Sequence, residues 1–294
     1  MWMLKKLGKA LICVILSPLA APLAHAEWVG NVDLGIRHDS NINNAQLGSD
    51  IASDSVSSAD LLATDFFALE DGNSVSITGQ SKGEVFHHYT GLNNVALGAA
   101  LGFRKKWALG PYAPWSGLSL SSQRINFTDA SRNGWRNQVA ISCGQRLFER
   151  WDVGAEYMLE RRTAAPLAAD QPGISGDVFS QTSRSMTLNA EYAWSERLFL
   201  TLGSLWRRGD VVSSARETSK IISSSQAIAA DQVFGPDFYA YKMRGTTYGL
   251  DVDMTIAFTS RNLLRASISR QVTHAGGDND YAKTVAMLSW TYHF

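Results

Sequence analysis

The chain has 294 residues, of which 45% are hydrophobic and 18% are charged, and its formal net charge is zero at pH 7. No segment approaches the roughly 18 continuous apolar residues that a membrane-spanning helix needs, which excludes a helical membrane protein. The balance of charge also gives no basic excess of the kind that nucleic-acid binding requires.

The first 26 residues have the pattern of a secretory signal peptide. Three lysines lie among the first nine residues, an apolar segment follows at Ala10–Leu16, and Ala24-His25-Ala26 provides an A-x-A cleavage site. We therefore expect residues 1–26 to be removed and residues 27–294 to form one domain. Cleavage would leave Cys143 as the only cysteine, which excludes an intramolecular disulfide in that domain.

Apolar and polar residues alternate along the rest of the chain, which is the pattern of half-buried strands. Between 246 and 258, for example, Tyr248, Leu250 and Val252 alternate with Asp251 and Asp253. In chain order we expect strands at 28–37, 61–70, 74–86, 95–105, 115–127, 135–147, 151–162, 185–194, 198–208, 246–258, 263–272 and 284–294. The register of the second strand is unclear from the pattern.

The connections between these strands alternate in length. Short turns follow the second, sixth, eighth and tenth strands, and a somewhat longer connection, 106–114, follows the fourth. Longer polar loops follow the odd-numbered strands, the longest being 38–60, 163–183 and 209–243. Short turns on one side and long loops on the other are typical of transmembrane barrels with an even strand count. The sequence thus predicts an all-β protein, a single transmembrane antiparallel β-barrel of about 12 strands. The apolar residues in 209–243 would constrict the mouth, cover a ligand or pack on neighbouring loops.

The last strand carries a more specific pattern. Ala286, Leu288, Trp290, Tyr292 and Phe294 alternate with other residues, and the chain ends on phenylalanine. This ending resembles the terminal signature of Gram-negative outer-membrane β-barrels. The resemblance implies location in the cell outer membrane and contact with outer-membrane lipid and lipopolysaccharide. It also implies recognition by the barrel assembly machinery through Trp290, Tyr292 and Phe294.

A second resemblance lies at the end of the first predicted strand. The segment from Gly35 to Asn44 contains Asp39-Ser40-Asn41-Ile42-Asn43, and it resembles the start of the barrel in surface lipoprotein assembly modifiers. The helical repeat domain that precedes that barrel is absent from this sequence. Asx-rich residues also form local hydrogen bonds at strand ends. The resemblance implies a role in export or surface assembly.

The inward positions of the predicted barrel carry both signs of charge. A barrel of eight strands is filled by its own side chains and one of 16–18 encloses a water channel, so twelve strands permit either state. We expect a porin-like channel for small solutes, with a non-conducting structural or assembly barrel as the alternative. Neither sign of charge dominates the inward positions. The candidates for selectivity are Asp33, Arg37, Lys82, Glu84, Asp251 and Asp253.

An outer-membrane lipid hydrolase is the third hypothesis, because such enzymes need a histidine base near the rim. Five histidines follow residue 26, and four of them lie near the loop-side ends of strands: His38, His87, His88 and His274, with His293 at the other end. His38 is expected to face outward, and no spacing of histidines supports a metal site. We therefore expect no enzymatic activity, no metal and no cofactor.

Overall fold

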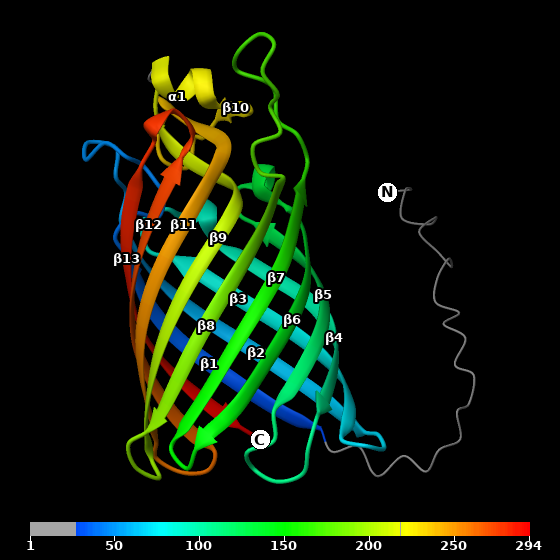
Figure 1. The fold of residues 1–294 in the computed structure, drawn as a ribbon. Coiled ribbons are helices and arrows are strands. Elements are labelled where there is room, and N and C mark those ends of the chain that lie inside the picture. The colour runs from blue at the N-terminus through cyan, green and yellow to red at the C-terminus, as the bar shows by residue number, and fades with distance from the viewer. Residues whose placement is uncertain (1–27, 218) are drawn as a thin grey trace, which may run out of the picture.

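The computed structural model describes residues 28–217 and 219–294, and the predicted signal peptide lies outside this part of the chain. The described residues form one antiparallel β-barrel of twelve strands, as the alternation predicts (Figure 1). A thirteenth short strand, β10 (Ala227–Ala230), pairs with β11 outside the barrel wall. The barrel strands are β1 (Val29–Asp39), β2 (Asp54–Ala68), β3 (Asn73–Phe86), β4 (Asn94–Lys106), β5 (Trp115–Phe127), β6 (Gly134–Phe148), β7 (Trp151–Ala164), β8 (Gln181–Ala193), β9 (Leu198–Arg216), β11 (Phe238–Ala257), β12 (Asn262–Ala275) and β13 (Tyr281–His293).

The wall closes where the first strand meets the last. β1 pairs with β2 on one side and with β13 on the other, with Leu34 opposite Trp290. Beyond the end of β13, the backbone N–H of Phe294 donates to the carbonyl of Gly30 at 3.0 Å. The pairing of β9 with β11 completes the ring. Closure leaves no edge strand in the wall with unpaired backbone N–H and C=O groups. A sheet that spans a membrane needs this pairing because hydrocarbon offers no hydrogen-bond partner.

The outer face of the wall is apolar, and the inner face is polar. Large apolar side chains are exposed at every second position of the strands, including Leu97 and Leu101 on β4 and Leu250 and Val252 on β11. Because successive strand residues point to opposite faces, the residues between them line the interior. A row of exposed apolar side chains around a closed wall is suited to contact with lipid.

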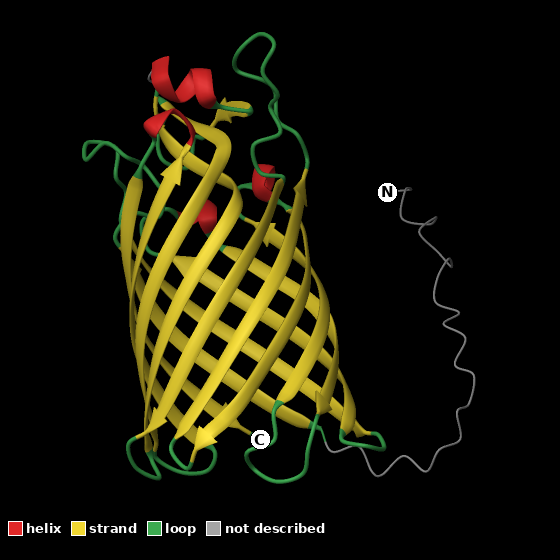
Figure 2. Cartoon of the chain, in the orientation of Figure 1, coloured by secondary structure: helices red, strands yellow, loops and turns green. Residues whose placement is uncertain are grey.

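The two ends of the barrel differ, as Figure 2 shows, and we name them by their connections. At the turn end, short connections join the strands; at the loop end, the long segments 40–53, 165–180 and 217–237 do so. The last of these segments contains helix α1 (Ser219–Ser224) and β10. No helix within 28–217 and 219–294 is long and apolar enough to cross a membrane.

The sequence-based boundaries of several strands were wrong, most of all those of β2, β9 and β11. β2 begins at Asp54 rather than at 61, and this start was missed because its first seven residues are mostly small or polar on both faces. β9 and β11 continue well past the expected limits of 208 and 246, so both ends of the loop predicted at 209–243 are strand. Their extensions pair with each other from Gly209–Gly245 up to Arg216–Phe238, where loops rather than lipid cover them.

The buried apolar core lies at the loop end and not in the middle of the barrel. Val56, Phe86 and Leu92 form one cluster with Val233 and Phe234 packed against it. Two further clusters contain side chains from the β9 and β11 extensions and from the long loops. The segment 217–237 therefore packs on its neighbours, which is one of the three arrangements considered for it.

Candidate functional site

Small and polar side chains line the lumen toward the turn end. Ser119, Glu156, Asn189 and Arg265 all face inward by the strand registers, and all are exposed. Side chains that pack together in a filled barrel would be buried, so this half of the lumen is open to water.

Three of the six selectivity candidates meet in one cluster. Arg37 on β1 donates to Glu84 on β3 at 2.6 Å, and Lys82 lies 3.4 Å from the same carboxylate. Lys82 also lies 3.4 Å from Asp60 on β2, a residue that the sequence pattern placed in the loop 38–60, just before the predicted second strand. Asn94 donates to the other oxygen of Glu84 at 3.1 Å. Two bases and two acids balance, so this cluster adds little net charge to the lumen.

The other three candidates lie apart from that cluster. Asp33 accepts a hydrogen bond from Thr291 at 2.6 Å, and Asp253 on β11 forms an ion pair with Arg265 on β12 at 2.7 Å. Asp251 faces Gly203 across the β9–β11 pair, and a methyl group at Gly203 would collide with its carboxylate. The six residues therefore form separate groups on two parts of the wall.

A cover closes over the loop end of the lumen. It is formed by residues 40–53, 89–93, 129–133, 165–180 and the described part of segment 217–237, namely 217 and 219–237. Asn43 on the first of these segments bonds to the β9 extension in both directions: its side chain donates to the carbonyl of Ser214 at 2.7 Å, and its own carbonyl accepts from Ser214 N–H at 2.8 Å. The side chain of Asn44 donates to Val212 at 3.0 Å. These asparagines, which the sequence pattern predicted to form local hydrogen bonds at a strand end, anchor one side of the cover.

A buried ion pair joins the other parts of the cover. Arg132, in the connection between β5 and β6, donates to Asp231 of segment 217–237 at 2.6 Å, and Asp231 also accepts from Ser214. The side chains are 11% and 0% exposed. The guanidinium of Arg132 lies 4.2 Å from the ring centre of Phe179, and Phe234 packs 5.0 Å from Tyr89 between ring centres. Charge pairing and aromatic packing therefore hold the cover together.

A cavity of about 330 Å³ lies directly beneath the cover. Its wall comes from β7, β8, β9, β11, β12 and β13, and its roof includes Asn43, Arg132 and Phe234. Four of its lining side chains are basic, and one is acidic: Arg132, Arg162, Arg207, Lys283 and Asp210. Among the described residues, no carboxylate lies within 4.0 Å of the side-chain nitrogens of Arg162 or Arg207. The cavity therefore presents a net positive surface to a solute.

The five histidines that the structure describes do not assemble a hydrolytic triad. On the outer face, His87 lies 3.2 Å from the Ser57 hydroxyl and His38 lies 3.3 Å from the Ser55 hydroxyl. A serine nucleophile also needs a group that orients its histidine base. His88 contacts Asp54 at 3.0 Å, but this carboxylate contacts neither His38 nor His87. Within the described residues, no group of three or more metal-ligating side chains is present either.

Comparison with known proteins identifies the fold. No family model and no curated protein sequence matches the chain. The crystal structure of an outer-membrane channel from Pseudomonas putida F1 matches with a TM-score of 0.57 at 13% identity, covering 94% of this chain and 97% of that one. A KdgM porin in complex with disordered oligogalacturonate matches with a TM-score of 0.44 at 10% identity, over 89% and 99% of the two chains. The Pseudomonas putida toluene transporter TodX matches with a TM-score of 0.41 at 10% identity, over 90% and 89%. The chain has the closed β-barrel fold of outer-membrane channels.

Proposed function

We propose that the protein is a channel for small solutes in the Gram-negative outer membrane. The open, polar half of the lumen carries this proposal, because a barrel with a purely structural role has no need of water inside it. The shared fold with an outer-membrane channel supports it. In this arrangement the turn end faces the periplasm and the loop end faces the exterior, as the lengths of the connections favour.

The cover supports a closed resting state. It packs over the loop end through a buried ion pair and several backbone hydrogen bonds, so solute passage requires at least part of it to move. The same packing favours the alternative, a non-conducting barrel whose loops present a fixed surface for export or assembly. Movement of the cover is the property that separates the two hypotheses.

Conductance of the purified protein in planar lipid bilayers tests the proposal. We expect stepwise currents with long closed periods. If neither the native protein nor a variant with a loosened cover shows current steps, the channel hypothesis is overturned and the non-conducting barrel is the function that stands.

The cavity beneath the cover supports a preference for anionic solutes. Arg162 and Arg207 line it without a carboxylate within 4.0 Å among the described residues, whereas the charges of the Arg37–Glu84 cluster balance. Rings of basic side chains favour anions in a pore. We expect the double variant Arg162→Gln/Arg207→Gln to shift the reversal potential in a potassium chloride gradient toward cation selectivity. The double variant Arg197→Gln/Arg261→Gln removes the same charge from two turns outside the lumen, and it should leave the reversal potential unchanged.

A further inference from the structure

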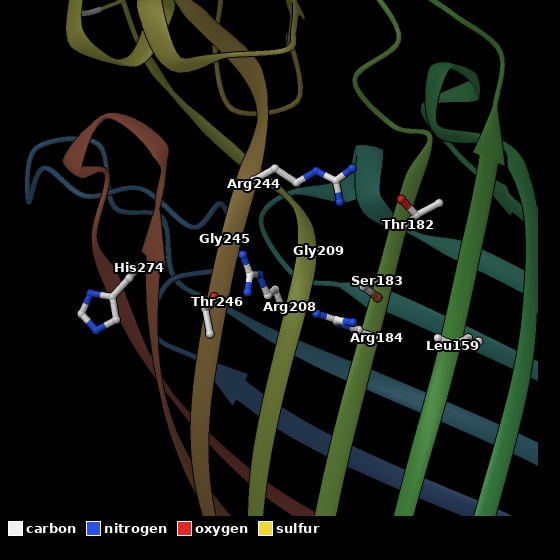
Figure 3. Close-up of a pocket in the computed structure, with 10 residues that line it drawn as sticks. All are labelled: Leu159, Thr182, Ser183, Arg184, Arg208, Gly209, Arg244, Gly245, Thr246 and His274. Atoms are coloured by element: carbon white, nitrogen blue, oxygen red, sulfur yellow. The ribbon is translucent and has the colours of Figure 1, made fainter.

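A row of outward side chains, three of the four basic, crosses the outer face of the barrel near the loop end. Arg184 on β8 lies opposite Arg208 on β9, which lies opposite Thr246 on β11, which in turn lies opposite His274 on β12. All four are outward positions, because they alternate with the lumen-facing residues of the same strands. Figure 3 shows these side chains, with Arg244 above the row, around a groove of about 690 Å³.

This row is only partly neutralised by the protein itself. Arg244 pairs with Asp210 at 3.2 Å, and His274 contacts Asp280 at 2.9 Å. Across residues 28–217 and 219–294, no carboxylate lies within 4.0 Å of a side-chain nitrogen of Arg184 or Arg208. Like charges directly opposite each other destabilise a pair of strands. An anion from outside the chain that bridges Arg184 and Arg208 would remove this repulsion.

The surface directly below the row is apolar. The next outward row contains Met186, Trp206, Tyr248 and Val272, which lie opposite one another on the same four strands. These side chains line a second groove of about 440 Å³, which continues down to Leu188 and Leu250. The ring of Trp206 lies 5.7 Å below the guanidinium of Arg184. The face thus combines an anion-binding upper part with an apolar lower part.

These two grooves match the two parts of a phosphorylated lipid. Guanidinium groups form strong, often bidentate hydrogen bonds with phosphate, and an acyl chain fits against exposed apolar side chains. The basic row lies at the upper edge of the apolar surface, where the phosphates of a lipid in the outer leaflet would stand. A soluble anion would use the upper groove but would leave the lower one uncovered.

We propose that this face of β8, β9, β11 and β12 binds the phosphorylated lipid A part of lipopolysaccharide. Arg184 and Arg208 contact a phosphate, Arg244 flanks it, and an acyl chain lies along Trp206 and Leu250. The inference rests on the proposed location in the outer membrane, and it is independent of whether the lumen conducts.

Native mass spectrometry of the full mature chain in detergent micelles tests this site. The probes are diphosphorylated lipid A, the same lipid without phosphates, and inorganic phosphate. We expect the diphosphorylated lipid to bind at least tenfold more tightly than the dephosphorylated one. The double variant Arg184→Gln/Arg208→Gln should lose at least tenfold of that affinity, whereas Arg197→Gln/Arg261→Gln, with the same change of charge at the turn end, should keep it.

Equal binding of both lipids would overturn the proposal, as would unchanged lipid A affinity in the Arg184→Gln/Arg208→Gln variant. Inorganic phosphate binding as tightly as the diphosphorylated lipid would show a site for free anions, which also contradicts it. A difference in gel migration between unheated and boiled samples of each variant confirms that its barrel is folded. Conductance measured on the same samples separates the two proposals, because the outward-facing row should affect lipid binding and leave currents unchanged.

Discussion

The substitution Asp231→Asn tests the proposed role of the cover most directly. It preserves the size of the side chain and the hydrogen bond that the side chain accepts from the Ser214 hydroxyl, but it removes the negative charge that lies 2.6 Å from Arg132. Both side chains are almost fully buried, so the variant leaves the guanidinium with the carboxylate of Asp129 alone, which lies 3.4 Å from Arg132 Nε and is more exposed. Removing one partner of a buried ion pair costs about 3–5 kcal/mol, and the contact with Asp129 places this variant at the lower end of that range.

That cost applies only to the closed state, because an open cover exposes Arg132 to water. Since about 1.4 kcal/mol corresponds to a tenfold change in an equilibrium, a loss of about 3 kcal/mol lowers the ratio of closed to open covers about 100-fold. The assay is single-channel recording in planar bilayers, with open probability as the measurement. We expect long open periods in Asp231→Asn where the native protein is mostly closed.

Two further variants make the result specific. Asp237→Asn removes an exposed charge from the same loop and should behave as the native protein. The double variant Arg132→Met/Asp231→Leu replaces the pair with apolar side chains and should restore closure, because a packed apolar pair often matches a buried ion pair in stability. Equal open probabilities for Asp231→Asn and Asp237→Asn would refute the role of the Arg132–Asp231 ion pair in keeping the cover closed.

Two other substitutions test the barrel wall and its assembly. Leu250→Arg places a charge on the outer face and should lower the free energy of unfolding in lipid vesicles, measured by urea titration, by about 2–4 kcal/mol. The control Ser269→Arg lies on the inner face opposite Asp251 and should change this free energy by less than about 1 kcal/mol. Equal losses in the two variants would place neither face against lipid. Phe294 pairs with Gly30 and packs beside Tyr292, and its removal should reduce the amount of folded protein in outer-membrane fractions several-fold. The control Phe258→Ala removes an exposed aromatic ring from a turn and should leave that amount unchanged. Normal amounts of the shortened chain would contradict the proposed assembly signal.

The strands were predictable from sequence because the environment on each side of the wall is uniform. Leu97, Leu101 and Leu250 face lipid, so their spacing repeats every two residues and identifies the strands without knowledge of any contact. The prediction was wrong where that contrast is absent. The first residues of β2 are small on both faces, and the β9 and β11 extensions lie against loops, so neither shows the alternation that lipid contact imposes.

The sites were harder to predict because they depend on residues that are distant in sequence. Arg132 and Asp231 are separated by 99 positions, and neither belongs to a motif that links it to the other. Arg184 and Arg208 could have been identified, because each lies two residues from an outward-facing side chain, Met186 or Trp206, and therefore faces outward as well. Charged residues at the edge of the apolar surface end the alternation, so the eighth strand was predicted to begin at 185, four residues after its actual start at Gln181. Arg184 was therefore left outside the strand, and the outward Arg208 was not recognised as part of a patch.

The position of the buried core explains how such a barrel could open without losing its structure. The wall is held by backbone hydrogen bonds around the whole ring, and these do not involve the cover. The cover is held by its own apolar clusters, by asparagine bonds to the β9 extension and by one buried ion pair. Segments with separate sets of contacts can open separately, each with its own free energy. Weakening the cover should therefore change conduction while the global stability of the barrel stays close to that of the native protein.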